Sequence, residues 1–144
     1  MPKRATPAQP TFPTWLWILM AVIVVAGAAF VLTRPAPTTS LPAEISVTKA
    51  YQGYNAGTYI LDVRQPDEWA AGHIPNATLI PLTELAKRVN EVPADREVII
   101  VCRSGNRSGQ ARDLLKEEGF TNVTSMAGGM NDWTAAGYPV VNEP

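Results

Sequence analysis

The sequence predicts an α/β domain built on an open, mainly parallel β-sheet flanked by helices and preceded by one transmembrane helix. Two observations predict this arrangement. From about residue 44 onward, short apolar segments rich in β-branched residues alternate with helical patterns across short connections, which is typical of parallel strands joined by helical crossovers. Before them, an apolar run without any charge extends from Trp15 to Leu32, long enough as a helix to cross a bilayer.

The residues before the domain divide into three predicted segments. Residues 1–13 hold four prolines, so we expect a disordered tail without a helix. The apolar run gives a predicted transmembrane helix at 14–33, whose uncharged part spans about 27 Å at the rise of an α-helix. Residues 34–43 are rich in proline and are expected to form a stiff linker. The folded domain is therefore placed at 44–144.

A cleavable signal peptide is the alternative to a transmembrane anchor, because the small residues Ala26–Ala28 could serve as a cleavage site. The anchor is preferred because the apolar run continues past that site and is long for a signal peptide. Lys3 and Arg4 precede the run, and Arg34 follows it. Since cytoplasmic flanks carry an excess of basic residues, we expect a single-pass membrane protein whose domain lies outside the cytoplasm.

Within the domain, the pattern predicts alternating strands and helices. Apolar runs rich in β-branched residues predict strands at 45–47, 59–63, 78–80, 97–101 and 123–126. Helical spacing bounded by caps, prolines and glycines predicts helices at 49–55, 66–71, 83–92, 107–118 and 130–135. Pro66 suits the first turn of its helix, and Thr83 is the expected N-cap of the next one. Ligands of such sheets bind beyond the carboxyl ends of the strands.

Composition restricts the functional classes. The chain is 46% hydrophobic and 17% charged, which is typical of a globular protein. Its net charge of −1 argues against a general nucleic-acid-binding protein, which needs a basic face. The single cysteine excludes an internal disulfide and a cysteine-rich metal centre, and the single histidine argues against a histidine-based zinc site.

The candidate site follows the fourth predicted strand, where the chain's only cysteine, Cys102, begins a polar loop. Gly105 and Asn106 can adopt unusual backbone angles, and a helix begins near Arg107. The backbone N–H groups of such a loop and helix start form a cradle for an anion. Together with the charges of Arg103 and Arg107, these dipoles favour the thiolate form of Cys102. The alternative is a buried, unreactive cysteine, against which the loop composition and the strand-end position argue.

Several motifs, taken in their order along the chain, resemble those of the rhodanese family of sulfurtransferases. The similarity covers about residues 45–141 and includes the loop that begins at Cys102. The other matching segments are Tyr59–Arg64, Pro66–Trp69, Gly72–Pro75, Ile80–Leu82, Gly128–Met130 with Trp133, and Gly137–Val140. Asn76 stands where the family usually has glycine, but Asn also tolerates left-handed backbone angles, so the turn should survive.

The resemblance implies a single-module sulfurtransferase of the thiosulfate sulfurtransferase type, in which Cys102 is the nucleophile. The Cys102 thiolate would take sulfane sulfur from thiosulfate or a persulfide donor, and an external thiol or cyanide would remove it. The residues predicted to bind the anionic donor are Arg103, Ser104, Gly105, Asn106 and Arg107. This chemistry needs no metal and no organic cofactor, and neither is expected.

Charged residues at the end of the second strand have two interpretations. Asp62, Arg64 and Glu68 could line the pocket, or they could form an ion-pair network that ties the loop to the body of the domain. We prefer the network, and we keep Arg64 as a weaker candidate for contact with the substrate. His73 titrates in a useful range, but the resemblance places it in a structural turn rather than in catalysis.

Two other functions stay open. A domain that carries or senses sulfur species without turnover would use the same Cys102. A cysteine-dependent phosphatase or arsenate reductase uses a similar thiolate, but its signature has five residues between cysteine and arginine, whereas four separate Cys102 from Arg107. The shorter loop should form a smaller cradle, which suits the outer sulfur of a donor better than the four oxygens of a phosphate.

Overall fold

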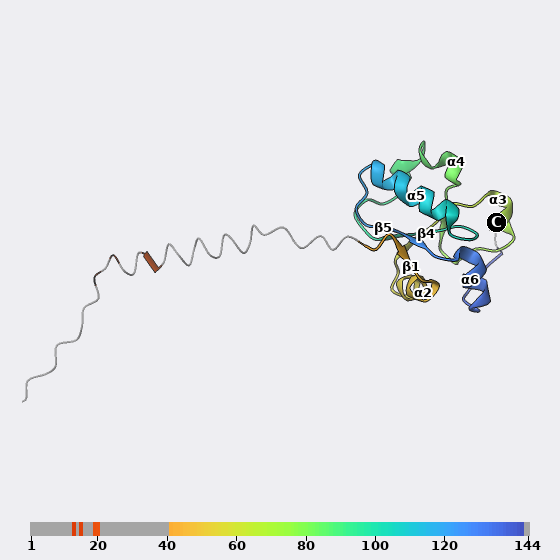
Figure 1. Cartoon of the computed structure of the whole chain (residues 1–144), viewed down its shortest axis with the longest axis horizontal. Coiled ribbons are helices and arrows are strands. Elements are labelled where there is room, and N and C mark those ends of the chain that lie inside the picture. Colours follow the sequence, from red (N-terminus) through yellow and green to blue (C-terminus); the bar gives the residue numbers. More distant parts are fainter. Residues whose placement is uncertain (1–12, 14, 16–18, 21–40, 143–144) are drawn as a thin grey trace, which may run out of the picture. The chain divides into compact units, whose positions relative to one another are not determined.

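The computed structural model of this chain describes Pro13, Trp15, Leu19, Met20 and residues 41–142. The chain divides into two units, residues 1–38 and residues 39–144, and nearly all of the described residues belong to the second (Figure 1).

The predicted tail and linker, and most of the transmembrane segment at 14–33, lie outside the described residues. Within the described part, no helix combines the length and the apolar character that crossing a membrane requires.

The second unit is built on a five-stranded sheet in the order β1-β5-β4-β2-β3. All four strand pairings are parallel. The strands are β1 (Glu44–Ile45), β2 (Tyr59–Asp62), β3 (Thr78–Leu79), β4 (Val98–Val101) and β5 (Val123–Met126). This confirms the predicted open parallel sheet, and it brings the carboxyl ends of β2, β4 and β5 to one edge.

Helices cover both faces of the sheet (Figure 1). They are α2 (Val47–Asn55), α3 (Pro66–Ala70), α4 (Leu82–Leu85), α5 (Asn106–Glu117) and α6 (Gly129–Ala135), with a 3₁₀ turn at Val89–Glu91. Helices α4 and α5 lie over one face, and α2 and α6 lie over the other (Figure 1). The predicted arrangement of a sheet flanked by helices is therefore confirmed.

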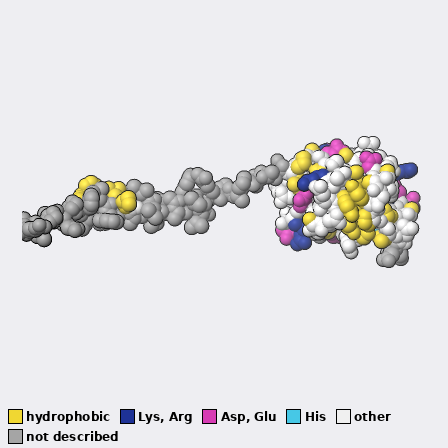
Figure 2. All heavy atoms as spheres, turned by 90° about the horizontal axis from the view of Figure 1, so that it is seen from below, with side chains coloured by type: hydrophobic (Ala, Val, Ile, Leu, Met, Phe, Trp, Pro, Cys, Tyr) yellow, Lys and Arg dark blue, Asp and Glu magenta, His cyan; other side chains and the backbone are white. Residues whose placement is uncertain are grey.

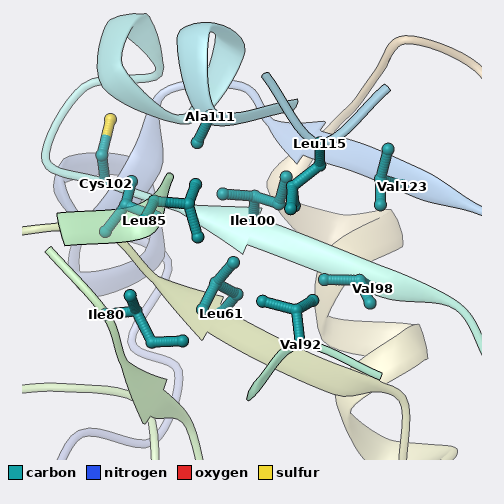
Figure 3. Close-up of a cluster of buried hydrophobic side chains, with 11 residues drawn as sticks. Leu61, Ile80, Leu85, Val92, Val98, Ile100, Cys102, Ala111, Leu115 and Val123 are labelled. Atoms are coloured by element: carbon teal, nitrogen blue, oxygen red, sulfur yellow. The ribbon is translucent and has the colours of Figure 1, made fainter. Parts of the chain in front are cut away.

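The core consists of two clusters, one on each face of the sheet. Strand β4 supplies both, because alternate residues of a strand point to opposite faces. Val98 and Ile100 pack against α5 residues such as Leu115, and Ile99 and Val101 pack on the α2–α6 side. Figure 3 shows Cys102 at the margin of the first cluster, with its sulfur pointing toward the loop before α5. The thiol is thus placed by the same alternation that builds the core.

The second cluster is rich in aromatic rings. Trp133 is fully buried, and the rings of Tyr51, Tyr54 and Tyr138 pack around it. Tyr51 and Tyr138 stack with their centroids 3.9 Å apart. Figure 2 views the domain from the side on which α2 and α6 lie and shows a band of hydrophobic side chains on that surface. Trp133 is therefore a core residue and anchors α6 to α2.

Most predicted elements have bounds that differ from the structure by one or two residues, and two of the differences have a clear local cause. The first predicted strand continued to Val47, but Ser46 is the N-cap of α2, and its hydroxyl accepts a hydrogen bond from the N–H of Lys49. An N-cap residue has an extended backbone. The strand-like alternation of apolar and polar residues therefore continues past the end of the strand to the first residue of the helix. β1 therefore ends at Ile45.

The helix predicted at 83–92 is interrupted. Helix α4 ends at Leu85, and a separate 3₁₀ turn follows at Val89–Glu91. Pro93 disfavours helical angles for the residue before it, and Val92 is indeed extended, with ψ of 128°. Thr83 lies inside α4 rather than capping it, because the helix already begins at Leu82 after Pro81.

Candidate active site

The candidate site lies at the edge of the sheet where β2, β4 and β5 end. Cys102 is the first residue after β4, and its side chain is 1% exposed. In the parallel register, Asp62 at the end of β2 lies opposite Val101 of β4. The loops that follow β2, β4 and β5 therefore meet around the thiol, at the position predicted for a ligand.

Two polar groups contact the sulfur of Cys102. The N–H of Gly105 donates to it at 3.1 Å, and the hydroxyl oxygen of Ser108 lies 3.6 Å away. Burial alone raises the pKa of the thiol, but the Ser108 side chain and the backbone N–H groups of Ser108, Ser104 and Gly105 lower it. The net pKa of Cys102 lies below its ordinary value. The site thus favours a thiolate, the nucleophilic form.

The loop can enclose the sulfur because of its backbone geometry. Gly105 has φ of +103°, a conformation that residues with a side chain rarely adopt. From there the chain enters α5 at Asn106, so the first N–H groups of the helix are directed at the site. Asn106 is the first residue of α5 and is exposed, and Ser104 is also exposed. Both line a polar cleft of about 370 Å³ beside the loop.

Ser108 belongs to the site, although it was not among the predicted site residues. It is fully buried, and its hydroxyl donates to the carbonyl of Gly105 at 2.8 Å. When the thiol ionises, the same hydroxyl can turn to donate to the sulfur. The sequence feature that could have identified Ser108 as a site residue is its position, six residues after Cys102 and in the first turn of the helix that follows the loop.

Helix α6 holds the beginning of the loop. The N–H of Met130 donates to the carbonyl of Cys102 at 2.8 Å, and the N–H of Asn131 donates to that of Arg103 at 3.1 Å. Gly129 lies so close that an added Cβ would overlap the carbonyl oxygen of Cys102. These two bonds tie the carbonyls of Cys102 and Arg103 to the start of α6.

The two arginines of the loop have different environments. Arg103 is exposed, and within residues 41–142 its side chain has no ion-pair or hydrogen-bond partner. Arg107 forms a two-pronged ion pair with Glu68 of α3, with N–O distances of 2.6 and 2.7 Å. The hydrogen bond from Arg107 lowers the pKa of Glu68 to about 2, despite the opposing effect of burial. Glu68 is therefore a carboxylate at any ordinary pH.

Arg64 is buried, and its guanidinium group is held by an ion pair and by hydrogen bonds. Its guanidinium contacts both carboxylate oxygens of Asp62 at 2.7–3.0 Å, and it donates to the carbonyls of Glu68 and Gly72. This matches the preferred network interpretation for Asp62 and Arg64. The carboxylate of Glu68, however, turns to Arg107 and to the N–H of Gln65. Arg64 lines a cleft next to the loop, and its contact with substrate stays a prediction.

That cleft has a volume of about 410 Å³ and lies between α3, the loop and α6. Its charged walls include Asp67, Glu68 and Arg103, and Met130 and Val140 contribute apolar surface. Since the cleft is larger than a small inorganic donor needs, it has room for an organic molecule beside the loop.

His73 occupies a structural position. Its backbone pairs with Val141 in both directions, and its ring stacks on that of Trp69, with the centroids 3.5 Å apart. The ring nitrogen Nδ1 lies 3.2 Å from the carbonyl oxygen of Trp69. These contacts agree with the expected structural turn.

Both the sequence and the fold of this chain are similar to those of known proteins. The model of the rhodanese-like domain family matches residues 46–136. A crystal structure of a rhodanese-related protein from Thermoplasma volcanium superposes with a TM-score of 0.66 at 34% identity, covering 71% of this chain and 100% of that one.

Two curated relatives match shorter stretches. A protein named thiosulfate sulfurtransferase GlpE, from Pseudoalteromonas translucida, is 40% identical over 77 residues, which are 54% of this chain and 73% of the relative. The putative sulfur carrier protein YrkF of Bacillus subtilis is 45% identical over 75 residues, which are 52% of this chain but only 40% of that protein. The chain therefore aligns with less than half of the second relative.

Proposed function

The chain belongs to the rhodanese-like family, and from this premise we propose that it is a sulfurtransferase working through a persulfide on Cys102. Its donor would be thiosulfate or a persulfide, and its acceptor a thiol or cyanide. The observation that carries this proposal is the environment of the Cys102 sulfur, which combines burial with a hydrogen bond donated by the N–H of Gly105 and a contact with the hydroxyl of Ser108. Such an environment stabilises an anionic sulfur at the end of the loop.

In the first step, the Cys102 thiolate attacks the outer sulfur of the donor. A new S–S bond forms as the original bond breaks, and the leaving group departs with the bonding electron pair, as sulfite when the donor is thiosulfate. The product is the Cys102 persulfide, whose terminal sulfur carries the negative charge. The N–H of Gly105 donates to the sulfur at 3.1 Å in the free protein and is proposed to stabilise the negative charge from this fixed position in the loop.

In the second step, the acceptor attacks the terminal sulfur of the persulfide. The Cys102 thiolate leaves with the electron pair, and the acceptor departs as thiocyanate or as a new persulfide. Because the chain has one cysteine, no second thiol of this chain can remove the sulfur, and the acceptor must come from outside. The two half-reactions give ping-pong kinetics.

Arg103 is proposed to attract the anionic donor because it is exposed and unpaired within residues 41–142. Ser104 and Asn106 are proposed to contact the donor or acceptor from the rim of the loop. Arg107 is proposed to hold the loop against α3 through Glu68, with its charge close to the reacting sulfur.

The test is the intact mass of the protein after treatment with thiosulfate. We expect a covalent gain of one sulfur atom, reversed by cyanide or by a small thiol. Cys102→Ser should gain no sulfur and should have no activity in a thiosulfate–cyanide assay, while its thermal unfolding stays close to that of the parent. Sulfur transfer retained by Cys102→Ser would exclude Cys102 as the nucleophile.

A sulfur carrier is the second candidate. The burial of Cys102, whose side chain is 1% exposed, would slow the loss of sulfur to small acceptors in solution, as suits a carrier. Steady-state turnover with excess acceptor separates the two functions, because a carrier would release its sulfur once and slowly. The phosphatase alternative gains no support, since the arginine it would need for phosphate is neutralised by Glu68.

We further propose that residues 14–33 anchor this protein in a membrane, with the domain outside the cytoplasm. The support is the uncharged run from Trp15 to Leu32 and the basic residues Lys3 and Arg4 before it. A cleaved signal peptide would leave the domain in the same compartment but without the anchor.

A further inference from the structure

Three arginines lie in or beside the loop that begins at Cys102, and two of them are neutralised by carboxylates. Arg64 is paired with the fully buried Asp62, and Arg107 is paired with Glu68. Only Arg103 brings a positive charge without a partner inside residues 41–142. The site is therefore less positive than the number of its arginines indicates.

The ion pair between Arg107 and Glu68 is a fixed part of the fold. The residues are 39 positions apart, and two short bonds join the helix α5 to the helix α3. Their side chains are 29% and 21% exposed, so water screens the pair only partly. Glu68 is also fixed from its own side, because the N–H of Gln65 donates to it at 3.1 Å. This carboxylate therefore stays beside the loop while a donor enters.

A fixed negative charge at this point affects donors unequally. Thiosulfate carries two negative charges, whereas an organic thiosulfonate presents the same outer sulfur with one. Each negative charge on a donor interacts with the charges of the site separately. The neutralisation of Arg107 therefore removes about twice as much electrostatic attraction for the dianion as for the monoanion. The thiolate of Cys102 adds repulsion with the same dependence on charge.

On the basis of the sulfurtransferase function proposed above, we propose that Glu68 is a specificity-determining residue. By neutralising Arg107, it shifts the preference of the enzyme from doubly charged donors toward singly charged sulfane-sulfur donors. Organic thiosulfonates and hydropersulfides belong to this class. The transfer step itself is unchanged, since each donor gives its outer sulfur to Cys102 and releases sulfite, sulfinate or thiolate with the bonding electron pair.

The experiment compares kcat/KM for thiosulfate and for methanethiosulfonate, with cyanide as the acceptor, in the full chain and in Glu68→Gln. Gln keeps a carbonyl oxygen that can accept from Arg107 but removes the charge. At low ionic strength we expect kcat/KM for thiosulfate to rise about threefold to tenfold, and for methanethiosulfonate by about the square root of that factor. The donor ratio, which is kcat/KM for thiosulfate divided by kcat/KM for methanethiosulfonate, should therefore rise in Glu68→Gln. This rise should disappear near 1 M salt, where the Debye length is about 3 Å.

Two further variants control the result. Glu84→Gln removes a carboxylate of similar type from the surface pair with Arg88 and should leave the donor ratio unchanged. The double variant Glu68→Gln/Arg107→Gln keeps the local charge sum at zero with two amides that can bond each other. Its donor ratio should stay near that of the parent, and this measurement remains informative if Glu68→Gln alone does not fold.

An unchanged donor ratio in a folded Glu68→Gln protein would overturn the inference, and so would a double variant that loses its use of thiosulfate selectively. Either result leaves the proposed function intact, provided that the protein still gains one sulfur atom by mass. If no donor adds sulfur to Cys102 in the parent protein, the proposed function itself has failed.

Discussion

The hydroxyl oxygen of Ser108 lies 3.6 Å from the sulfur of Cys102 and bridges it to the carbonyl of Gly105, to which it donates at 2.8 Å. Both side chains are buried, so no bulk water can replace this contact. A single hydroxyl thus connects the sulfur of Cys102 to the residue that gives the loop its shape.

Ser108→Ala should therefore raise the pKa of the Cys102 thiol. A thiol with a lowered pKa is active at a lower pH, so the rate of sulfur uptake should rise with pH and level off below the ordinary cysteine value of about 8.5. Removing the hydroxyl shifts this midpoint upward and should reduce the rate at neutral pH by about threefold to tenfold. The pH profile of thiol alkylation measures the pKa directly.

Ser125→Ala provides a matched control for that experiment, because Ser125 is also a buried serine but bonds to the carbonyl of Ala43. The pKa of the Cys102 thiol in Ser125→Ala should equal that of the same thiol in the parent protein. An alkylation profile that is the same in Ser108→Ala and in the parent would remove Ser108 from the activation of the thiol.

Acid should weaken the link between α3 and α5. The pKa of Glu68 is about 2 in the folded protein, against about 4.3 in an unfolded chain. A carboxyl with a depressed pKa stabilises the fold above the unfolded value, and this contribution is lost as the pH falls through the folded value. Glu68→Gln should lower the unfolding free energy by about 1 kcal/mol at pH 6 and by almost nothing near pH 2.

Unfolding measured against pH for both proteins checks this difference. A gap between parent and variant that persists unchanged at pH 2 would mean that Glu68 stabilises the fold by packing rather than by charge.

Gly129 should tolerate no side chain. Its φ is +57°, and an added Cβ would overlap the carbonyl of Cys102. Gly129→Ala should lower the unfolding free energy by about 2–4 kcal/mol and should displace the start of the loop. Gly109 is the control, because it lies inside α5 with open space around it.

Gly109→Ala should be neutral or stabilise the protein by up to about 1 kcal/mol. Urea unfolding of both variants tests the pair. Equal stabilities of the two alanine variants would contradict the close approach of α6 to the loop.

Much of this site could be predicted from the sequence because it depends on neighbours in the chain. Cys102 follows a strand whose β-branched residues are evident, and Arg64 pairs with Asp62 two residues away. The partner of Arg107 could not be predicted in the same way. Glu68 comes from helix α3, 39 residues earlier, and only the parallel pairing of β2 with β4 brings the two together.

Local competition explains the other differences. Ser46 satisfies both a strand-like alternation and a helix cap, and the cap is favoured because its hydroxyl bonds the N–H of Lys49. The segment before Pro93 has helical spacing, but its chain turns extended at Val92. Such choices depend on hydrogen bonds that a periodic pattern does not record.

The proposed anchor predicts that the full chain stays in the membrane fraction after washing with salt and alkali. A shortened chain that begins at Leu41 should be soluble and active. It keeps Pro42 and Ala43, whose carbonyls accept bonds from Thr124 and from Ser125 and Arg112. A soluble mature protein that begins near Ala29 would replace the anchor with a signal peptide.

The side of the membrane needs a separate measurement. A thiol reagent too polar to cross the membrane should label Cys102 in intact cells or spheroplasts. Labelling only after lysis would place the domain in the cytoplasm, provided that the shortened chain is labelled under the same conditions.

The two bonds from α6 to the loop also bear on the cost of the reaction. Because Met130 and Asn131 hold the carbonyls of Cys102 and Arg103, these peptide groups are oriented before any donor arrives. In water, dipoles must rearrange around a sulfur whose charge moves outward during transfer. In the proposed transfer, that rearrangement is largely completed when the protein folds, so its reorganisation energy is met by folding stability rather than by the activation barrier.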